Sequence, residues 1–201
     1  SVLKNKDFRI YSYILLLSFS MVAIFEACAS LLLHNVLGYG TVMTSVLFTL
    51  PLPAYLLGSY LSNRWAAHKT INQLCSIAIS YIAAASFVLL LFALLHIVNA
   101  FVIIAPITVI VLGIGIIFPA ATTGALQPFT EIAGTAGAIL GGVQNVGCAA
   151  CIGISSTMAQ KNQLPLAGCL AGITMLLCII AINLRRSRKI AKKVDTCARP
   201  L

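Results

Sequence analysis

Apolar residues dominate this sequence in six long blocks that are separated by short polar segments. The blocks cover approximately residues 10–36, 41–61, 71–95, 100–126, 134–158 and 166–184. Each is close to the roughly 20 residues that a helix needs to cross the hydrocarbon core of a bilayer. Lipid offers backbone groups no hydrogen-bond partner, and the alternating pattern of a membrane barrel is missing. The pattern therefore predicts an all-α polytopic membrane protein with six transmembrane helices.

Positive charges collect before the first block, between the second and third blocks, and after the sixth block. With an even number of spans these three segments lie on the same side of the membrane. They hold 12 of the 13 Lys and Arg residues, and only Lys161 falls on the other side. The positive-inside rule then predicts cytoplasmic termini in a plasma (bacterial inner) membrane. We interpret the basic tail, residues 185–201, as an anchor at anionic lipid, with no nucleic-acid partner.

Composition agrees with this topology. With 60% hydrophobic and 8% charged residues, the chain has too few charges for a soluble domain of its length, and the loops are too short to hold one. The seven cysteines are an odd number and six lie inside the apolar blocks, which argues against a disulfide framework. Cys148-x-x-Cys151 has no His or acid nearby in sequence, so we interpret it as helix packing and predict no metal site.

Glu26 is the only acidic residue well inside an apolar block. An ionised carboxylate at such depth costs several kcal/mol, so it is neutral, paired or in contact with water. On a helix Phe19, Ala23, Glu26 and Ser30 share one face. Two interpretations follow: this face lines a cavity that takes protons or cations, or a neutral Glu26 hydrogen-bonds to a neighbouring helix.

The fifth block combines small and polar residues. Gln144 and Asn145 lie near its middle, and both a substrate cavity and interhelical hydrogen bonding explain them. Gly137-x-x-x-Gly141 has the spacing that lets two membrane helices pack backbone to backbone, and Gly168-x-x-x-Gly172 repeats it in the sixth block. We therefore predict close helix packing at these glycines.

Further residues are predicted to act in gating. Pro51 and Pro53 interrupt the second block and predict a bent helix. Glu131 stands at the start of the fifth block, where it suits a helix N-terminus and can pair with Arg64 when the inner face closes. Such an exposed pair adds little stability, but it can bias one state over another.

Three stretches resemble a known family. The stretch Gln127-Pro-Phe-Thr-Glu-Ile-Ala-Gly-Thr-Ala-Gly-Ala-Ile-Leu-Gly-Gly142 resembles the entry to helix eleven of major facilitator superfamily drug–proton antiporters of the bicyclomycin/chloramphenicol-resistance (Bcr/CflA) group. Lys4-Asn-Lys-Asp-Phe-Arg9 resembles the end of their central linker, which residues 1–9 would then complete. Gly58-x-x-x-x-Asn63-Arg64 resembles the superfamily's loop motif without its Asp and second Gly.

The resemblance implies that residues 10–184 form the C-terminal six-helix half of such a transporter, built as a 3+3 inverted repeat. A partner, either an N-terminal half or a second copy, would complete a midplane cavity. The first and fourth helices of a half line that cavity most, which places Glu26 in a lining helix. The implied activity is export of small amphiphilic compounds by proton antiport, powered by the proton gradient without a cofactor.

Other functional classes fit the sequence less well. The chain lacks the Gly-x-Ser-Gly motif and later His of a rhomboid protease, and it has no intramembrane pair of Asp residues, so we do not expect an enzyme. The remaining alternative is an accessory or relic six-span subunit without transport activity of its own. Because Ser1 stands first, we expect a fragment, and the coding sequence upstream of it distinguishes the two interpretations.

Overall fold

Every regular element that the structure describes is a helix. The computed structural model describes residues 2–157 and 163–197, and no strand occurs within these residues. The elements are η1 (Val2–Lys4), α1 (Lys6–Leu31), the π-helical turn η2 (Leu32–Val36), α2 (Thr41–Thr49), α3 (Leu52–Ala66), α4 (Ile71–Leu94), α5 (Ala100–Leu126), η3 (Gln127–Ile132), α6 (Ala133–Ser156) and α7 (Leu164–Cys197). The all-α prediction is confirmed for this part of the chain.

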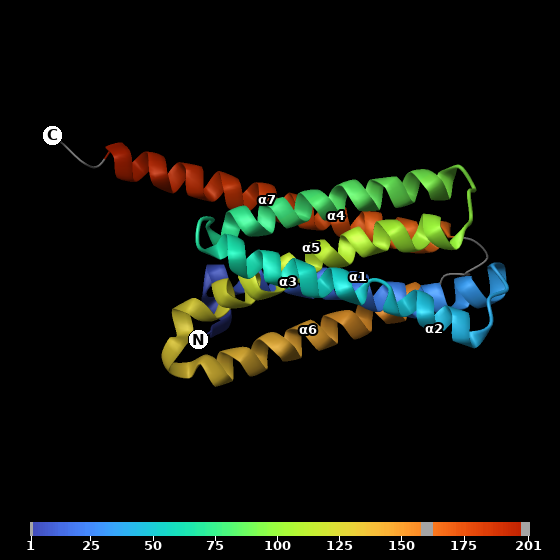
Figure 1. Cartoon of the computed structure of the whole chain (residues 1–201). Coiled ribbons are helices and arrows are strands. Elements are labelled where there is room, and N and C mark those ends of the chain that lie inside the picture. Colours follow the sequence, from blue (N-terminus) through green and yellow to red (C-terminus); the bar gives the residue numbers. More distant parts are fainter. Residues whose placement is uncertain (1, 158–162, 198–201) are drawn as a thin grey trace.

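Within the described residues, five helical stretches are long and apolar enough to cross a membrane, as expected of a multi-pass membrane protein. The longest, Ala100–Ser156, has 57 residues and contains α5, η3 and α6. A straight helix of that length would extend about 85 Å, almost three times the hydrocarbon thickness. Phe129 in η3 departs from helical geometry (φ −128°, ψ 37°), and α6 runs back along the bundle from there (Figure 1). The count of six spans and the inverted repeat remain predictions.

Proline separates α2 from α3. The two helices end and begin on either side of Pro51, which is buried, and Pro53 lies in the first turn of α3. The Pro51 carbonyl accepts hydrogen bonds from the backbone amides of Ala54 and Tyr55 at 3.1 and 3.3 Å, so the helix restarts immediately. Because proline has no N–H to donate, the break falls where the sequence predicts a bend. Helix α5, in contrast, holds its two prolines inside one continuous helix.

Helices α3 and α5 make backbone contact through glycine. A Cβ on Gly58 would collide with a carbonyl oxygen of α5, and a Cβ on Gly115 would collide with the Tyr55 carbonyl oxygen of α3. The buried Ser62 Oγ donates a hydrogen bond to the Ile116 carbonyl oxygen at 3.0 Å across the same interface. Small residues here allow the close approach that is typical of membrane helices.

Helix α1 contacts α5, α6 and α7. Its contact with α6 also relies on a small residue, because a Cβ on Gly147 would collide with the Leu16 side chain. One turn away along α1, Ser20 Oγ donates to Cys148 Sγ at 3.7 Å. Cys148 is buried in this contact, in agreement with a packing role for the cysteine.

The described chain forms no close helix contact at Gly137-x-x-x-Gly141, so the close packing predicted there stays a prediction. A Cβ built on either glycine meets no atom within 4 Å, and the same holds for Gly168 and Gly172. The reason is the rotation of each helix about its axis. Helix α6 turns Ala136 and Leu140 into the core, which leaves its glycine pair beside the contact rather than in it.

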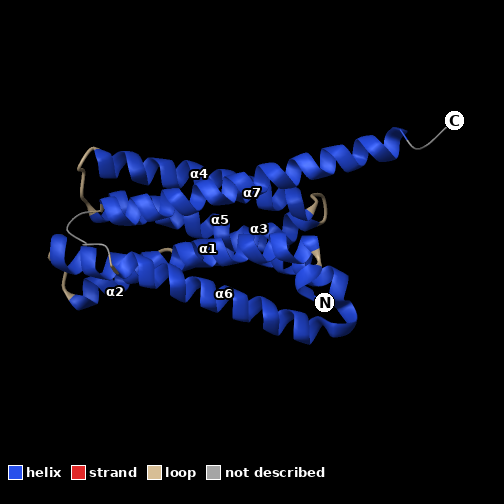
Figure 2. Cartoon of the chain, turned by 180° about the vertical axis from the view of Figure 1, so that it is seen from behind, coloured by secondary structure: helices blue, strands red, loops and turns tan. Residues whose placement is uncertain are grey.

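One end of the bundle gathers the N-terminus, the α3–α4 loop, η3 and the C-terminal end of α7 (Figures 1 and 2). Exposed basic side chains lie in these segments: Lys4, Lys6, Arg9, Arg64 and Lys69. We call this the basic end. Helix α7 continues past the membrane-length stretch that ends at Asn183, while its side chains from 184 onward and residues 198–201 lie outside the described part. The side of the membrane on which the basic end lies stays a prediction.

Candidate functional site

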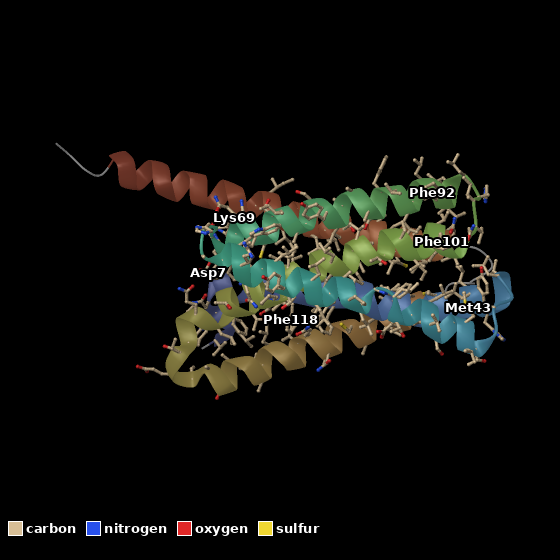
Figure 3. The ribbon with its side chains drawn as sticks, viewed as in Figure 1. Asp7, Met43, Lys69, Phe92, Phe101 and Phe118 are labelled. Carbon is tan, nitrogen blue, oxygen red and sulfur yellow. The ribbon has the colours of Figure 1, made fainter. Side chains whose placement is uncertain are left out.

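Three aromatic side chains from three helices meet part-way along the bundle. The Phe118 ring of α5 lies 5.6 Å from the Phe19 ring of α1 and 6.5 Å from the Tyr55 ring of α3, measured between centroids. Figure 3 shows Phe118 part-way along the bundle, nearer to the end with Asp7 than to the end with Met43. None of the three is fully buried, and Phe19 keeps 36% of its surface exposed. This aromatic group offers an apolar surface with ring faces at the depth of the bilayer interior.

Glu26 lies two turns beyond Phe19 on α1. Its side chain is exposed, and it forms no hydrogen bond or ion pair with any described residue. The bond to a neighbouring helix that one interpretation of the sequence requires is therefore absent within the described chain. A bare carboxylate on a lipid-facing surface is costly, so this position requires water or a partner group.

The face of α1 on which we expected Phe19, Ala23, Glu26 and Ser30 is described over three of the four residues. Phe19 and Glu26 are exposed and Ala23 is half-buried, so these three share an accessible side of the helix. The Ser30 side chain lies outside the described part. Exposure on a common side is what a cavity-lining face requires, and the role itself stays a prediction.

The polar pair of α6 has no partner in the described chain. Gln144 is half-buried, Asn145 is exposed, and neither side chain hydrogen-bonds to a described residue. The interhelical hydrogen bond that the sequence left open is thus not formed within this chain. Both amides remain available to a substrate or to a second helix bundle.

The expected gating residues lie at different places in the bundle. Arg64 and Glu131 are both exposed at the basic end, and no ion pair joins them among the described residues. Pro51 is buried at the α2–α3 break, next to the exposed Pro53. Pro51 contacts the aromatic group only through the backbone hydrogen bond that its carbonyl accepts from the Tyr55 amide. The gating roles of Arg64, Glu131 and the prolines stay predictions.

Two members of the aromatic group, Tyr55 and Phe118, are absent from the residues that the sequence singled out. Phe118 precedes Pro119 in the fourth apolar block, which the family resemblance already identified as a lining helix. An aromatic residue in that block was a usable signal. The sequence around Tyr55 carries no such signal, because an aromatic residue two positions after Pro53 is common in an apolar helix.

Comparison with known proteins supplies one clear relative. The chain is 32% identical over 187 residues to Multidrug resistance protein D of Escherichia coli (strain K12). The alignment covers 92% of this chain and 47% of the relative, so the chain spans about half the length of the curated relative it matches. No family model matches the chain.

The alignment leaves only a small part of the chain uncovered, so the similarity belongs to the whole helix bundle rather than to one motif. The chain is thus similar, over most of its length, to half of a protein that bears the name of a multidrug resistance protein. This relationship agrees with the resemblance to drug transporters that the sequence motifs indicate.

Proposed function

We propose that this chain is the C-terminal six-helix half of a major facilitator superfamily drug exporter of the Bcr/CflA type. Together with an N-terminal half, it exports small amphiphilic compounds from the cytoplasm in exchange for protons. The observation that carries the proposal is the similarity to Multidrug resistance protein D, which extends over 92% of this chain and 47% of that protein. The protein is then a transporter and not an enzyme.

The accessible sides of α1 and α5 support this function. The aromatic group of Phe19, Tyr55 and Phe118 provides large ring surfaces that suit the apolar part of an amphiphile. The group is incompletely covered by the chain itself, as expected if a second half encloses a shared cavity. Binding between two halves is the arrangement by which transporters of this architecture alternate access.

Glu26 is the residue that we assign to proton coupling. It is exposed, unpartnered within the described chain, and on the same side of α1 as Phe19. An intramembrane carboxylate facing a water-filled cavity can exchange its proton with solvent, whereas one facing lipid cannot ionise cheaply. Proton binding at Glu26 would change the charge of the cavity wall two turns of α1 away from Phe19, which links protonation to substrate binding.

The exposed side of α6 supports a partner half. Ala138, Gly142, Asn145, Ala149 and Gly153 recur there every three or four residues, and all are exposed. Small residues at this spacing allow a second helix to approach closely. We expect the N-terminal half to pack against this side, which would also give Asn145 a partner.

Transport in proteoliposomes tests the proposal. When the full-length protein is reconstituted and a pH gradient is applied across the membrane, it is expected to transport an amphiphilic dye. Glu26→Gln is expected to abolish the dependence of dye transport on the gradient. The matched control is Glu26→Asp, which keeps a carboxylate at the same position and is expected to retain the response.

Equal gradient dependence in the wild-type protein and Glu26→Gln would remove Glu26 from proton coupling. Absence of export by a correctly folded full-length protein would favour the accessory-subunit alternative. The coding sequence upstream supplies an independent check, because the proposal requires about six further spans in the same reading frame.

A further inference from the structure

The membrane-length stretch of helix α1 ends in a titratable side chain, His34. This stretch starts at Lys6 in the basic end, so His34 lies where the span meets water at the opposite end of the bundle, which we call the far end. The end of α1 lies beside α2 there (Figure 1). The His34 side chain is exposed. Histidine is the side chain that ordinarily gains and loses a proton between pH 5 and 8.

The helix changes from α to π geometry just before this residue. In a regular α-helix, eight residues turn about 80° past two full turns, which would move His34 away from the side of α1 that exposes Glu26. The turn η2 is instead closed by a hydrogen bond from the Leu37 amide to the Leu32 carbonyl oxygen at 3.3 Å, five residues back. A π-helical turn rotates less per residue, so it returns His34 toward the side of Glu26.

The His34 ring is held through one of its two nitrogen atoms. Nδ1 lies 3.1 Å from the Tyr39 carbonyl oxygen, and because a carbonyl oxygen only accepts, Nδ1 carries the hydrogen. In the neutral ring Nε2 is then the bare nitrogen. Nε2 forms no hydrogen bond or ion pair with a described residue. It is therefore the atom that can take up and release a proton while the ring stays in place.

The carbonyl that holds the ring is positioned by the turn after η2. Gly38 has a φ of 67°, in the left-handed region that glycine adopts without strain, and the chain reverses there. The Tyr39 amide donates to the Leu33 carbonyl oxygen at 3.1 Å, which keeps Tyr39 beside η2. The orientation of the His34 ring thus follows from the local backbone.

Few titratable groups surround His34 in the described chain. Helix α2 packs against η2 and contains none, and the turn between them contributes Tyr39. The last turns of α1 contribute Glu26 and the buried Cys28. No ion pair joins His34 to an acid among the described residues, and Glu26 is the carboxylate nearest to it in sequence.

We propose that His34 is the proton-entry residue of the transporter and passes protons to Glu26. This role rests on the proposed function, in which Glu26 couples export to protons. With the basic end in the cytoplasm, the far end faces the outside, from which protons enter during export. A proton-entry residue at the far end is what such an exchange requires.

The transfer between the two residues runs through water. They are eight positions apart, about 12 Å along the helix axis, which is too far for direct transfer. The N–H bond at His34 Nε2 breaks and a water molecule takes the proton. The last water of the chain then gives a proton to a carboxylate oxygen of Glu26. His34 keeps its Nδ1–H, and the neutral ring accepts the next proton from outside.

Proton uptake coupled to dye export by the full-length protein in proteoliposomes tests this role. The rate is measured at mildly alkaline pH on the far-end side, where capture of a proton limits it. His34→Gln keeps an N–H for the Tyr39 carbonyl but cannot release a proton. It is expected to slow proton uptake about tenfold or more, since positioned proton transfer contributes about 10²–10⁴-fold. His34→Lys keeps a cation that holds its proton at this pH, so it is expected to be slow as well.

Chemical rescue distinguishes a proton carrier from a structural side chain. Imidazole added on the far-end side carries protons itself, so it is expected to restore the rate of His34→Gln and to leave Glu26→Gln inactive. The control His96→Asn changes an exposed histidine of the α4–α5 loop, outside α1, and is expected to keep the wild-type rate. Asparagine suits this position because the φ of His96 is 54°.

The possible results decide between the roles. A wild-type rate in His34→Gln overturns the proposal, and so does a slow rate that imidazole does not restore or an equal loss in His96→Asn. Dye exchange without a pH gradient, at the wild-type rate, shows that each variant is folded. Failure of the proposed function looks different, because the wild-type protein itself then exports no dye in response to the gradient, and the role of His34 falls with it.

Discussion

Replacing Gly115 by alanine is expected to destabilise the bundle, although alanine is the better helix former. A Cβ at this position collides with the Tyr55 carbonyl oxygen, and it also lies 3.1 Å from the Tyr55 carbonyl carbon and 3.2 Å from Gly58 Cα. Carbon atoms in ordinary contact are about 3.5–4.0 Å apart. Helices α3 and α5 must therefore separate by roughly half an ångström or more before the side chain fits.

The size of the effect follows from three terms. Overpacking of a core costs about 1–3 kcal/mol. Separation also strains the hydrogen bond from Ser62 Oγ to the Ile116 carbonyl oxygen, now 3.0 Å long, and such interhelical bonds average about 0.6 kcal/mol in membranes. Alanine recovers about 1 kcal/mol of helix propensity. The net loss in the free energy of unfolding is about 0.5–2.5 kcal/mol.

The matched control is Gly168→Ala. Gly168 is exposed on α7, and a Cβ there meets no atom within 4 Å, so the same chemical change should stabilise by up to about 1 kcal/mol. The free energy of unfolding of each variant is measured in the full-length protein in mixed detergent micelles, with circular dichroism as the signal. A Gly115→Ala protein as stable as the Gly168→Ala protein would refute the reasoning.

Further predictions concern individual contacts. Phe118→Ala removes two ring contacts and is expected to raise the KM for an aromatic amphiphile about 2- to 10-fold. The control Phe101→Ala changes a side chain that is 80% exposed and lies outside the aromatic group, so it should leave the KM unchanged. Equal KM values for the two variants in a transport assay would contradict the assignment of the aromatic group to substrate binding. Ser86→Ala loses the 2.8 Å hydrogen bond to Thr174. Because the Thr174 hydroxyl keeps its bond to a carbonyl of its own helix, the free energy of unfolding should fall by only about 0.6 kcal/mol. A loss above about 2 kcal/mol would count against it. Phe129→Ala removes the edge contact that holds η3 against α1, and hydrogen exchange of the η3 amides should accelerate; unchanged exchange would show that the ring is dispensable.

The position of several helices was readable from the sequence because the apolar length of a segment is a local property. The pattern places spans at 71–95 and 100–126, and the structure has helices at Ile71–Leu94 and Ala100–Leu126. The break at Pro51 was also readable, since a missing N–H acts on its own helix. The same pattern placed the first span at residue 10, whereas α1 begins at Lys6 because the Asn5 side chain caps it.

Only part of the candidate site could be predicted from the sequence. A common face for Phe19 and Glu26 follows from the helical period, and both side chains are exposed on α1. Tyr55 and Phe118 join Phe19 only because α3 and α5 pack as they do. The charges at the basic end likewise come from distant segments, and Asp7 and Lys69 line one pocket only after folding.

The sequence by itself determined that the chain is helical and apolar enough to span a membrane, because lipid leaves a backbone no other way to satisfy its hydrogen bonds. It also determined which residues are small enough for close contact. Only the tertiary structure decided which of them make that contact: Gly58 and Gly115 touch the facing backbone, while Gly137 and Gly141 meet no atom within 4 Å. The physical reason is that spacing alone leaves the rotation of each helix about its axis undefined, and that rotation is set by packing against every neighbouring helix together.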